Sequence, residues 1–293
     1  MILVRYGEIG LKGKLRRTFE NLLISNIKRS LKMRGMEKDV TAEWGRIYIH
    51  SDDEKIAKLV AGVFGVASTS VAVETDSRMS SIRAKALEIG SEIIDQENSF
   101  AVRARRAGEH EFTSMDVQET VGAELQTQTG ARVDLSNPDV AIYIEVRESS
   151  SYIYTSIIPG FGGLPVGSQE RVLSVIDDRK SLDSTWYALR RGCDVDILVS
   201  PGIEDAYEIL LPWADYRKIR VLQGNGGIGE MLSHAFTTRY PAIYCSATMD
   251  DVSDLLPLLR ERRMPVLTPL LPFSEDEIEE KIGIIENYFN SIN

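Results

Sequence analysis

Several side chains that could do chemistry follow one apolar stretch in the second half of the chain. The stretch 171–176 predicts a strand, and a helix is expected from residue 182. Carboxylates and hydroxyls follow the strand at Asp177, Asp178, Ser181, Asp183 and Ser184. A turn between strand and helix binds phosphate when glycines let backbone N–H groups surround the anion. This turn has no glycine, and Asp177 and Asp178 would repel a phosphate unless a metal ion intervened.

Four turns in this half are expected at the edge where a parallel sheet binds ligands, the carboxyl ends of its strands. They follow Ile176, Val199, Leu222 and Cys245. Cys245 is therefore a candidate persulfide carrier or nucleophile, and a buried free thiol is the alternative. A reactive thiol needs a lowered pKa, for which Arg239 and His234 are the nearby candidates in sequence. The histidines and cysteines lack ligand spacing, so no zinc site is predicted.

The segment 224–229 matches the pattern G-x-G-x-x-G, after a short apolar run and before an expected helix. In that context the pattern is typical of dinucleotide binding, and Asp250 follows at a suitable spacing for a ribose ligand. However, the strand is short, and the motif lies in the middle of its domain instead of opening it. A bound dinucleotide, an anion at the helix start and a structural turn are the three interpretations.

Basic residues gather near the N-terminus although the whole chain carries a net charge of −10. Residues 1–50 hold 11 Lys and Arg against 5 Asp and Glu, a local balance of +6. Cations at the start of a helix expected over 16–33 oppose the helix dipole, which suggests an anionic partner; a solvated turn is the alternative. A second cluster lies on a strand expected over 100–106. The predicted RNA-phosphate contacts are Lys12, Lys14, Arg16, Arg17, Arg103, Arg105 and Arg106.

The composition is that of an ordinary globular protein, with 43% hydrophobic and 27% charged residues. No apolar run reaches the roughly 18 residues that span a membrane, and the apolar N-terminus is too short for a signal peptide. Two cysteines cannot form a disulfide framework, which favours a reducing cytoplasm. The Gly- and Pro-rich segment 160–169 divides the chain into two parts, each long enough for its own core.

The elements expected before this division predict an α+β arrangement, and those after it predict a parallel sheet covered on both faces. The first part has expected strands at 1–6, 44–50, 67–74, 100–106, 133–135, 140–146 and 152–158, and helices at 16–33, 52–63, 80–95 and 114–127. The second has strands at 171–176, 195–199, 219–222, 242–245 and 266–270, and helices at 182–191, 203–211, 230–239, 249–262 and 275–289.

Three pieces of the sequence resemble the tRNA sulfurtransferases, or 4-thiouridine synthetases, a family also tied to thiamine thiazole synthesis. The segments 4–9 and 11–14 with Arg17-x-Phe19-Glu20 resemble its N-terminal ferredoxin-like domain. The segments 100–106, 133–135, 138–139 and 152–154 resemble a THUMP domain, a module that binds tRNA. The segment 162–169 resembles the join to an ATP-pyrophosphatase (PP-loop) domain.

The resemblance implies a fold of three domains. An α+β ferredoxin-like domain (1–76) and a THUMP domain (77–165) would precede an α/β parallel-sheet domain (166–293), which would be PP-loop-like, or adenine nucleotide alpha hydrolase-like, and degenerate. In the family, the first strand of this last domain ends in Ser-Gly-Gly-x-Asp-Ser. Here either Ser181 or the pair Asp183-Ser184 aligns with that motif, and neither alignment supplies the glycines.

The resemblance also implies candidate site residues and partners. A remnant ATP site would use Ser181, Ser184 and Ser200, with ATP and Mg²⁺ as the cofactors if it still binds, and Asp183 and Cys245 are the catalytic candidates. We predict a cytoplasmic tRNA-binding protein that takes part in tRNA thiolation but has lost ATP-dependent adenylation. The alternatives are an active tRNA sulfurtransferase with a persulfide donor protein, and sulfur transfer to a small molecule in thiamine thiazole synthesis. A homodimer is a further expected partner, and a membrane is not.

Overall fold

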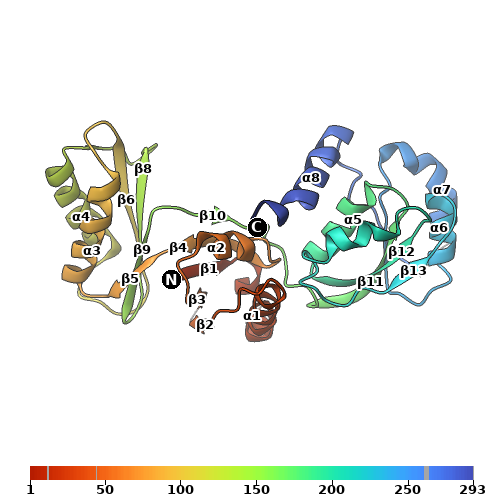
Figure 1. Cartoon of the computed structure of the whole chain (residues 1–293), viewed down its shortest axis with the longest axis horizontal. Helices are drawn as coiled ribbons and strands as arrows, with labels where there is room; N and C mark the ends of the chain where they lie inside the picture. The colour runs from red at the N-terminus through yellow and green to blue at the C-terminus, as the bar shows by residue number, and fades with distance from the viewer. Residues whose placement is uncertain (12, 44, 261–263, 293) are drawn as a thin grey trace. The chain divides into compact units, whose positions relative to one another are not determined.

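Three five-stranded sheets organise the part of the chain that the computed structural model describes, residues 1–11, 13–43, 45–260 and 264–292 (Figure 1). These residues form two compact units. One contains 1–3, 50–53 and 70–158, and the other contains 4–49, 54–69 and 159–293. The first unit is built mainly from the middle of the chain, whereas the second combines segments near the N-terminus with the C-terminal part of the chain.

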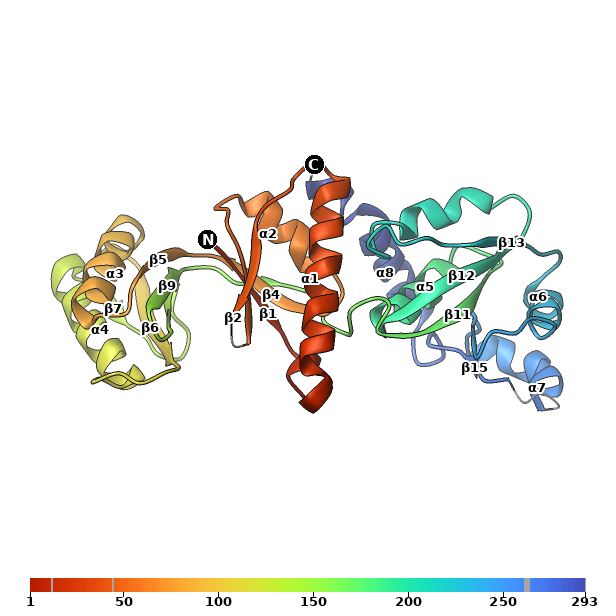
Figure 2. The same cartoon turned by 90° about the horizontal axis from the view of Figure 1, so that it is seen from below.

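The first sheet has the strand order β10-β4-β1-β3-β2 and is accompanied by two helices. Helix α1 (Arg16–Met33) is the long helix in Figure 2, and it has the bounds predicted from its apolar spacing. Its positions Leu23, Ile27 and Leu31 are fully buried. The other elements are β1 (Ile2–Tyr6), η1 (Glu8–Leu11), η2 (Gly13–Leu15), β2 (Val40–Glu43), β3 (Arg46–Ile49), α2 (Glu54–Ala61), β4 (Val66–Val71) and β10 (Ile158–Pro159).

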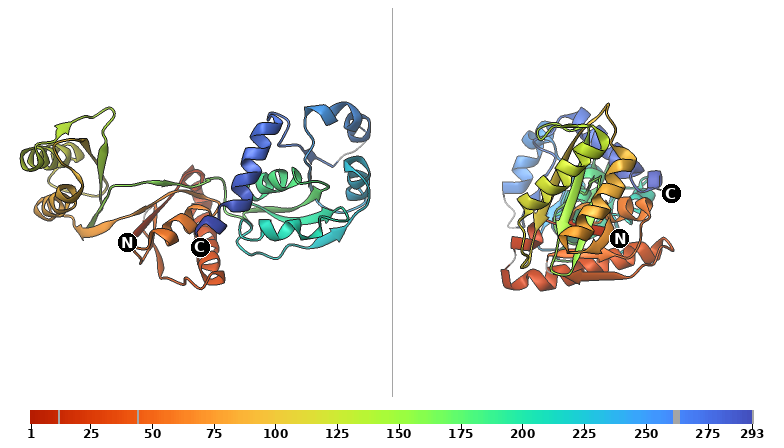
Figure 3. Two further views of the ribbon diagram at one scale, coloured as in Figure 1. Left: turned by 45° about the horizontal axis from the view of Figure 1, so that its top comes forward. Right: turned by 90° about the vertical axis from the view of Figure 1, so that its left-hand side faces the viewer.

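The second sheet has the order β5-β9-β8-β6-β7, and α3 and α4 lie side by side on one of its faces (Figure 3). Phe100 and Val102 of β6 point into the core with the helices, so the alternate positions Arg103 and Arg105 belong to the opposite face. The elements are β5 (Val73–Asp76), α3 (Met79–Ile93), β6 (Ser99–Arg106), α4 (Ser114–Thr129), β7 (Arg132–Val133), β8 (Val140–Val146) and β9 (Ser150–Tyr154).

The third sheet is parallel throughout and has the order β13-β12-β11-β14-β15. Its strands are β11 (Gln169–Ile176), β12 (Cys193–Val199), β13 (Val221–Gln223), β14 (Ile243–Tyr244) and β15 (Val266–Leu267). Its helices are α5 (Ser181–Arg190), η3 (Glu204–Leu210), α6 (Ile228–Ala235), η4 (Met249–Asp251), α7 (Val252–Arg260), α8 (Glu275–Asn287) and η5 (Asn290–Ile292).

Helices cover both faces of this third sheet. On one face, the hydroxyls of Ser174 in β11 and Thr185 in α5 form a hydrogen bond of 2.7 Å. On the other face, Leu173 and Val175 of the same strand pack in one core cluster with Met231 of α6. Because strand side chains alternate between faces, α5 and α6 lie on opposite sides. The doubly covered parallel sheet predicted from the sequence is confirmed.

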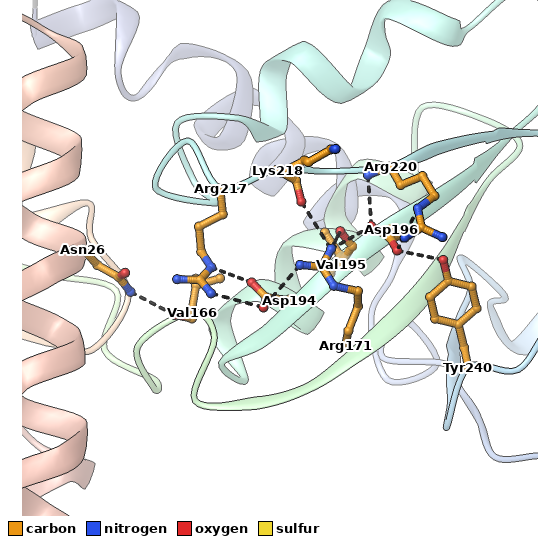
Figure 4. A network of polar contacts seen from close by, with 10 residues as sticks. All are labelled: Asn26, Val166, Arg171, Asp194, Val195, Asp196, Arg217, Lys218, Arg220 and Tyr240. Atoms are coloured by element: carbon orange, nitrogen blue, oxygen red, sulfur yellow. Dashed lines mark hydrogen bonds and ion pairs between the residues drawn. The ribbon is translucent and has the colours of Figure 1, made fainter.

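A polar network fixes the amino-terminal edge of the third sheet (Figure 4). Arg171 of β11 donates to Asp196 of β12 at 2.7 Å, and the Tyr240 hydroxyl donates to the same carboxylate at 2.7 Å. Arg217 donates to Asp194 at 2.5 Å. Burial alone would raise the pKa of Asp196, but hydrogen bonds, the largest from Tyr240, outweigh burial and lower that pKa. This network therefore holds strands and loops together at the edge opposite the carboxyl ends.

Six aromatic side chains pack together in the second unit. The Trp213 ring centroid lies 4.9 Å from that of Phe161, 4.8 Å from Phe289 and 5.6 Å from Phe64. The Trp213 indole N–H is satisfied by the carbonyl of Ile285 in α8, at 2.9 Å. The members of this aromatic cluster are Phe64, Phe161, Trp186, Trp213, Tyr288 and Phe289. The cluster joins the turn after α2, the segment 160–169, helix α5, the segment after η3 and the residues that follow α8.

The structure corrects several predicted elements. The single strand expected over 67–74 is two strands, β4 and β5, which belong to different sheets. Strand β2 was not predicted, because only Val40 of its four residues is buried and the alternation is too short to recognise. The helix expected over 203–211 is a 3₁₀ helix. The cap of α4 is Thr113 instead of Ser114, and it forms a capping box with Asp116.

The close packing of the aromatic cluster predicts that Gly62 cannot be enlarged without cost. A Cβ atom at this position would lie 2.6 Å from the Tyr288 ring and 2.7 Å from the Phe289 ring. We expect Gly62→Ala to lower the free energy of unfolding by about 1–3 kcal/mol, measured by urea denaturation. The control is Gly283→Ala in α8, where a Cβ would meet nothing within 4 Å. Equal stability of G62A and the wild type would contradict this account of the packing.

Candidate functional site

The strand order places two of the predicted turns at the topological switch point of the third sheet. Helix α5 leads from β11 to β12 on one side, whereas α6 leads to β14 on the other side of β11. Ligands of such sheets bind where the chain direction diverges in this way. Asp177 follows β11 and Ser246 follows β14 after Cys245, and the Ser246 hydroxyl donates to the Asp177 carboxylate at 3.2 Å. The turns after Ile176 and Cys245 were predicted from the sequence, but Ser246 was not predicted as a site residue. The signal that could have indicated Ser246 is its position directly after the strand expected over 242–245.

The start of α5 is occupied by carboxylates of the protein itself. The Ser181 hydroxyl lies 2.9 Å from an Asp177 carboxylate oxygen and 3.1 Å from one of Asp178. The Ser181 backbone N–H donates to the same Asp178 oxygen at 3.1 Å. Burial, and then repulsion by Asp178, raise the pKa of Asp177, while hydrogen bonds from Ser181 and Ser246 oppose that rise. The position where a helix start would receive a phosphate therefore already holds negative charge.

The cations of the same turn are paired with acids. Arg179 donates through Nε and a terminal nitrogen to Glu286 of α8, at 2.9 and 2.7 Å, and also bonds to Glu279 at 2.5 Å. Lys180 lies 3.6 Å from Asp178. These pairs are partly exposed, so they contribute little to stability, but they draw both cations toward acids of the protein itself.

Asp183 and Ser184 of α5 point into the protein interior. Asp183 is fully buried, and neither of its carboxylate oxygens has a hydrogen-bond partner among the described residues. Burial raises the pKa of Asp183 to about 6, against an opposing effect of the Lys281 charge. The Ser184 hydroxyl donates to the Cys245 carbonyl at 2.8 Å and so ties α5 to the end of β14. Of the three polar residues predicted in α5, Ser181 alone reaches the turn.

Cys245 is a buried free thiol in the described structure. Burial raises the pKa of this thiol to about 11, an N–H bond from Ala247 lowers it, and the charges of Asp177 and Asp251 raise it further. The groups that act on the thiol thus favour its protonated form, and Arg239 and His234 are not among them. Because the thiolate is the nucleophilic form, this environment favours a buried, unreactive thiol over a nucleophile or persulfide carrier. The sulfur-carrying role of Cys245 stays a prediction.

Side chains of the protein itself occupy the space around the glycine-rich segment 224–227. The Ser200 hydroxyl donates to the Gly226 carbonyl at 3.1 Å, so this predicted nucleotide ligand supports the turn. Gly226 has a φ of +81°, and the Glu230 carboxylate lies against its α-carbon. Gly224 lies in the same way against the Met231 side chain. An incoming phosphate would meet the Glu230 charge, so these contacts favour the structural turn over a dinucleotide or anion site.

The first group of predicted RNA contacts lies at the start of α1. Lys14 and Arg17 are exposed, and both line a hollow of about 520 Å³. The Arg16 guanidinium donates to the Tyr6 hydroxyl at 3.2 Å, and that hydroxyl donates to Glu20 at 3.0 Å. Arg16 is therefore positioned partly by its neighbours. Lys12 lies outside the described residues.

The second group lies on β6 and belongs to the other unit. Arg103, Arg105 and Arg106 are all exposed. Arg103 donates to the Leu135 carbonyl at 2.9 Å, and Arg106 donates to the Gly108 carbonyl at 3.1 Å. These carbonyls leave the positive charges without a paired acid in the contacts described, so the exposed strand end can attract a phosphate backbone.

The described residues form neither a metal-binding cluster nor a membrane-spanning helix. No group of three or more His, Cys, Asp or Glu in this part of the chain could hold a metal ion. No helix built from these residues is long and apolar enough to cross a bilayer. The charged features that remain are the α5 turn and the two groups of basic residues.

Comparison with known domains assigns the first half of the chain. Residues 1–70 match the ThiI ferredoxin-like domain, and residues 54–156 match the THUMP domain. The chain is thus a THUMP protein with a ferredoxin-like N-terminal domain and a PP-loop-type α/β domain, as the sequence predicted. A probable tRNA sulfurtransferase of Methanothermobacter thermautotrophicus is 40% identical over 205 residues, which cover 67% of this chain and 51% of that protein.

Two solved structures are similar over nearly the whole chain. PH1313 from Pyrococcus horikoshii has a TM-score of 0.80 and 26% identity, covering 96% of this chain and 99% of that one. A 4-thiouridine synthetase in complex with RNA and with bound ATP has a TM-score of 0.74 and 25% identity, covering 99% and 86%. The chain belongs to the tRNA sulfurtransferase (4-thiouridine synthetase) family. It spans about half the length of the curated relatives it matches.

The burial of Asp183 predicts a distinct pH dependence of stability. Its folded-state pKa of about 6 exceeds the ordinary value of 3.8, so the folded state holds a proton more tightly than the unfolded state. Stability from this group is therefore lost as the pH rises from about 4 to 6, by about 1–3 kcal/mol. We expect Asp183→Asn to remove that loss, so that its unfolding free energy falls less between pH 4 and pH 8 than that of the wild type.

Urea denaturation at several pH values measures this difference. The exposed Asp250, changed to Asn, provides a control with the same chemical substitution at the surface. Parallel pH profiles for D183N and the wild type would contradict a raised pKa at Asp183.

Proposed function

We propose that this protein binds tRNA through its ferredoxin-like and THUMP domains and takes part in tRNA thiolation without adenylating the uridine itself. The family membership, the tRNA sulfurtransferase name of its relative and the likeness to a synthetase–RNA complex support the first part. The exposed basic residues on α1 and β6 suit recognition of folded RNA through its backbone, since A-form helices hide most base edges.

The carboxylates at the start of α5 are the observation that carries the second part. Asp177 and Asp178 share the Ser181 hydroxyl there, and Asp178 accepts the Ser181 N–H. A phosphate oxygen about 4 Å from one carboxylate would meet a repulsion on the order of 1–4 kcal/mol. Two carboxylates and several phosphate charges multiply this cost. The turn therefore suits a helix capped by its own acids better than a site for the pyrophosphate of ATP.

In this proposal other proteins supply the chemistry that the turn lacks. A persulfide donor protein would provide sulfur, and a separate activating protein would adenylate the uridine. The chain would contribute the tRNA-binding surface, in the cytoplasm, alone or as a homodimer. A second candidate is retained ATP and Mg²⁺ binding at the same sheet edge, with Ser181, Ser184 and Ser200 nearby; the bound ATP of the similar synthetase favours it.

The RNA-binding part predicts that Arg103 and Arg105 carry phosphate contacts. We expect R103Q/R105Q to weaken tRNA binding and to reduce the slope of log affinity against log salt by about 1–2. Filter binding at several salt concentrations measures both effects. The matched control is R83Q/K85Q on α3, whose side chains pair with Glu124 and Glu88. Unchanged affinity and slope in R103Q/R105Q would overturn this assignment.

The second part predicts weak or absent nucleotide binding. Titration calorimetry of the wild type with Mg²⁺ and ATP should show no saturable heat at millimolar nucleotide, corresponding to less than about 4 kcal/mol of binding free energy. D177N/D178N removes the two charges and keeps the side-chain size, so it should bind ATP at least as well as the wild type. A micromolar dissociation constant in the wild type would reject the proposed loss and favour the second candidate.

A further inference from the structure

Helix α1 carries an exposed basic face that extends well beyond the cluster at its start. The helix contains five Lys and Arg but one acidic residue, Glu20. Positions 17, 21, 25, 28 and 32 fall within an arc of about 80° on the helix surface. This arc lies opposite the buried Leu23 and Ser30. All five side chains are exposed, and they define the α1 outer face: Arg17, Asn21, Ser25, Lys28 and Lys32.

Two hollows follow one another along this face. Arg17 and Asn21 line the first, of about 520 Å³. Ser25, Lys28 and Lys32 line the second, of about 390 Å³. Because Asn21 and Ser25 are one helical turn apart, the two hollows adjoin. From Arg17 to Lys32 the face extends over about 22 Å.

The charges of the second hollow are available to an anion. Lys32 lies 3.9 Å from Glu37, but both side chains are largely exposed, at 73% and 70%, and such a pair contributes little. Lys38 and Arg29 add further positive charge to the lining. The hollow thus holds four cations against one acid, in a chain whose net charge is −10. Charge concentrated against the sign of the whole molecule marks a place where an anionic polymer would bind.

We propose that the α1 outer face binds the sugar–phosphate backbone of double-stranded RNA along its whole length. Lys28 and Lys32 contact phosphates at one end of this track, and Arg17 with Lys14 contacts phosphates at the other. Asn21 and Ser25 between them donate to phosphate oxygens or ribose hydroxyls. This inference rests on the proposed tRNA binding and extends the predicted contacts at the helix start along the helix to Lys28 and Lys32.

The residue types of the α1 outer face favour double-stranded RNA over other binding partners. None of its five residues is aromatic, so it offers no platform for the stacked bases of single-stranded RNA. It has no apolar anchor of the kind that central protein–protein contacts use, and no apolar edge that could enter a membrane. A straight helix surface with cations at both ends and hydrogen-bond donors between them matches a regularly charged duplex backbone.

A binding titration of the full-length protein tests the proposal. The probes are a tRNA transcript, a 16-base-pair RNA duplex and a single strand of 16 nucleotides. We expect K28Q/K32Q to bind tRNA and duplex about tenfold more weakly at low salt, with a salt slope smaller by about 2. Its binding to the single strand should change less. The control K55Q/K58Q removes the same charge from α2 of the same domain, and thermal unfolding checks that each variant is folded.

The outcomes separate this inference from the proposed function. If K28Q/K32Q binds like the wild type while R103Q/R105Q is weakened, the α1 track is wrong and tRNA binding stands. Equal losses in K28Q/K32Q and K55Q/K58Q would show a general charge effect and would also overturn the track. An equal loss on duplex and single strand would reject the duplex as occupant. If the wild type binds none of the three RNAs, the proposed function fails as well.

Discussion

The packing of the segment 160–169 is the constraint on which the second unit depends. Gly160 and Gly162 donate backbone N–H bonds to the carbonyls of Ala67 and Val66, both at 2.9 Å. A side chain at Gly160 would overlap the Val66 carbonyl, so the close approach requires glycine there. Phe161 between them enters the aromatic cluster. A segment whose composition suggests a free linker is instead fixed on both sides, and Leu164 continues the contact by donating to the last turn of α5.

Charged groups at the carboxyl edge of the third sheet, in the same unit, are paired with other groups of the protein. Where a helix start could accept a phosphate, α5 receives Asp178, and at the next strand end Glu230 lies against Gly226. Arg179 is held by two acids of α8. Such internal pairing leaves little electrostatic attraction for a nucleotide, because each group has a partner that an incoming phosphate must displace. The cations of α1 and β6 are mostly exposed, and the Lys32–Glu37 pair among them is exposed as well, so more positive charge is available to an anion in the first half of the chain.

Secondary-structure elements were predicted well from the sequence where a regular spacing of apolar residues marks their buried side. The roles of individual side chains were predicted poorly where they depend on contacts formed in the fold. Helix α1 was found with its bounds, since Leu23, Ile27 and Leu31 repeat at helical spacing. The switch-point turns followed from alternating strands and helices. The run 67–74 gave no sign of its division, because no Gly, Pro or Asn separates the end of β4 from the start of β5. Neither the inward direction of Asp183 nor the partnership of Ser246 with Asp177 could be predicted, since each depends on contacts between distant segments.

The two sides of helix α1 have different surroundings, since one packs against the C-terminal part of the chain and the other is exposed. Its inner side receives the C-terminal part of the chain: Asn26 donates to the Val166 carbonyl at 3.0 Å, and the Arg34 guanidinium lies 4.6 Å from the Phe289 ring centroid. Arg29 acts on the buried Asp215, whose pKa burial raises to about 8. These contacts hold the helix in place, which would lower the entropy lost in the proposed RNA binding. Under the proposed function, the α/β domain would serve tRNA binding as the support of the helix that carries the charge, even without nucleotide chemistry of its own.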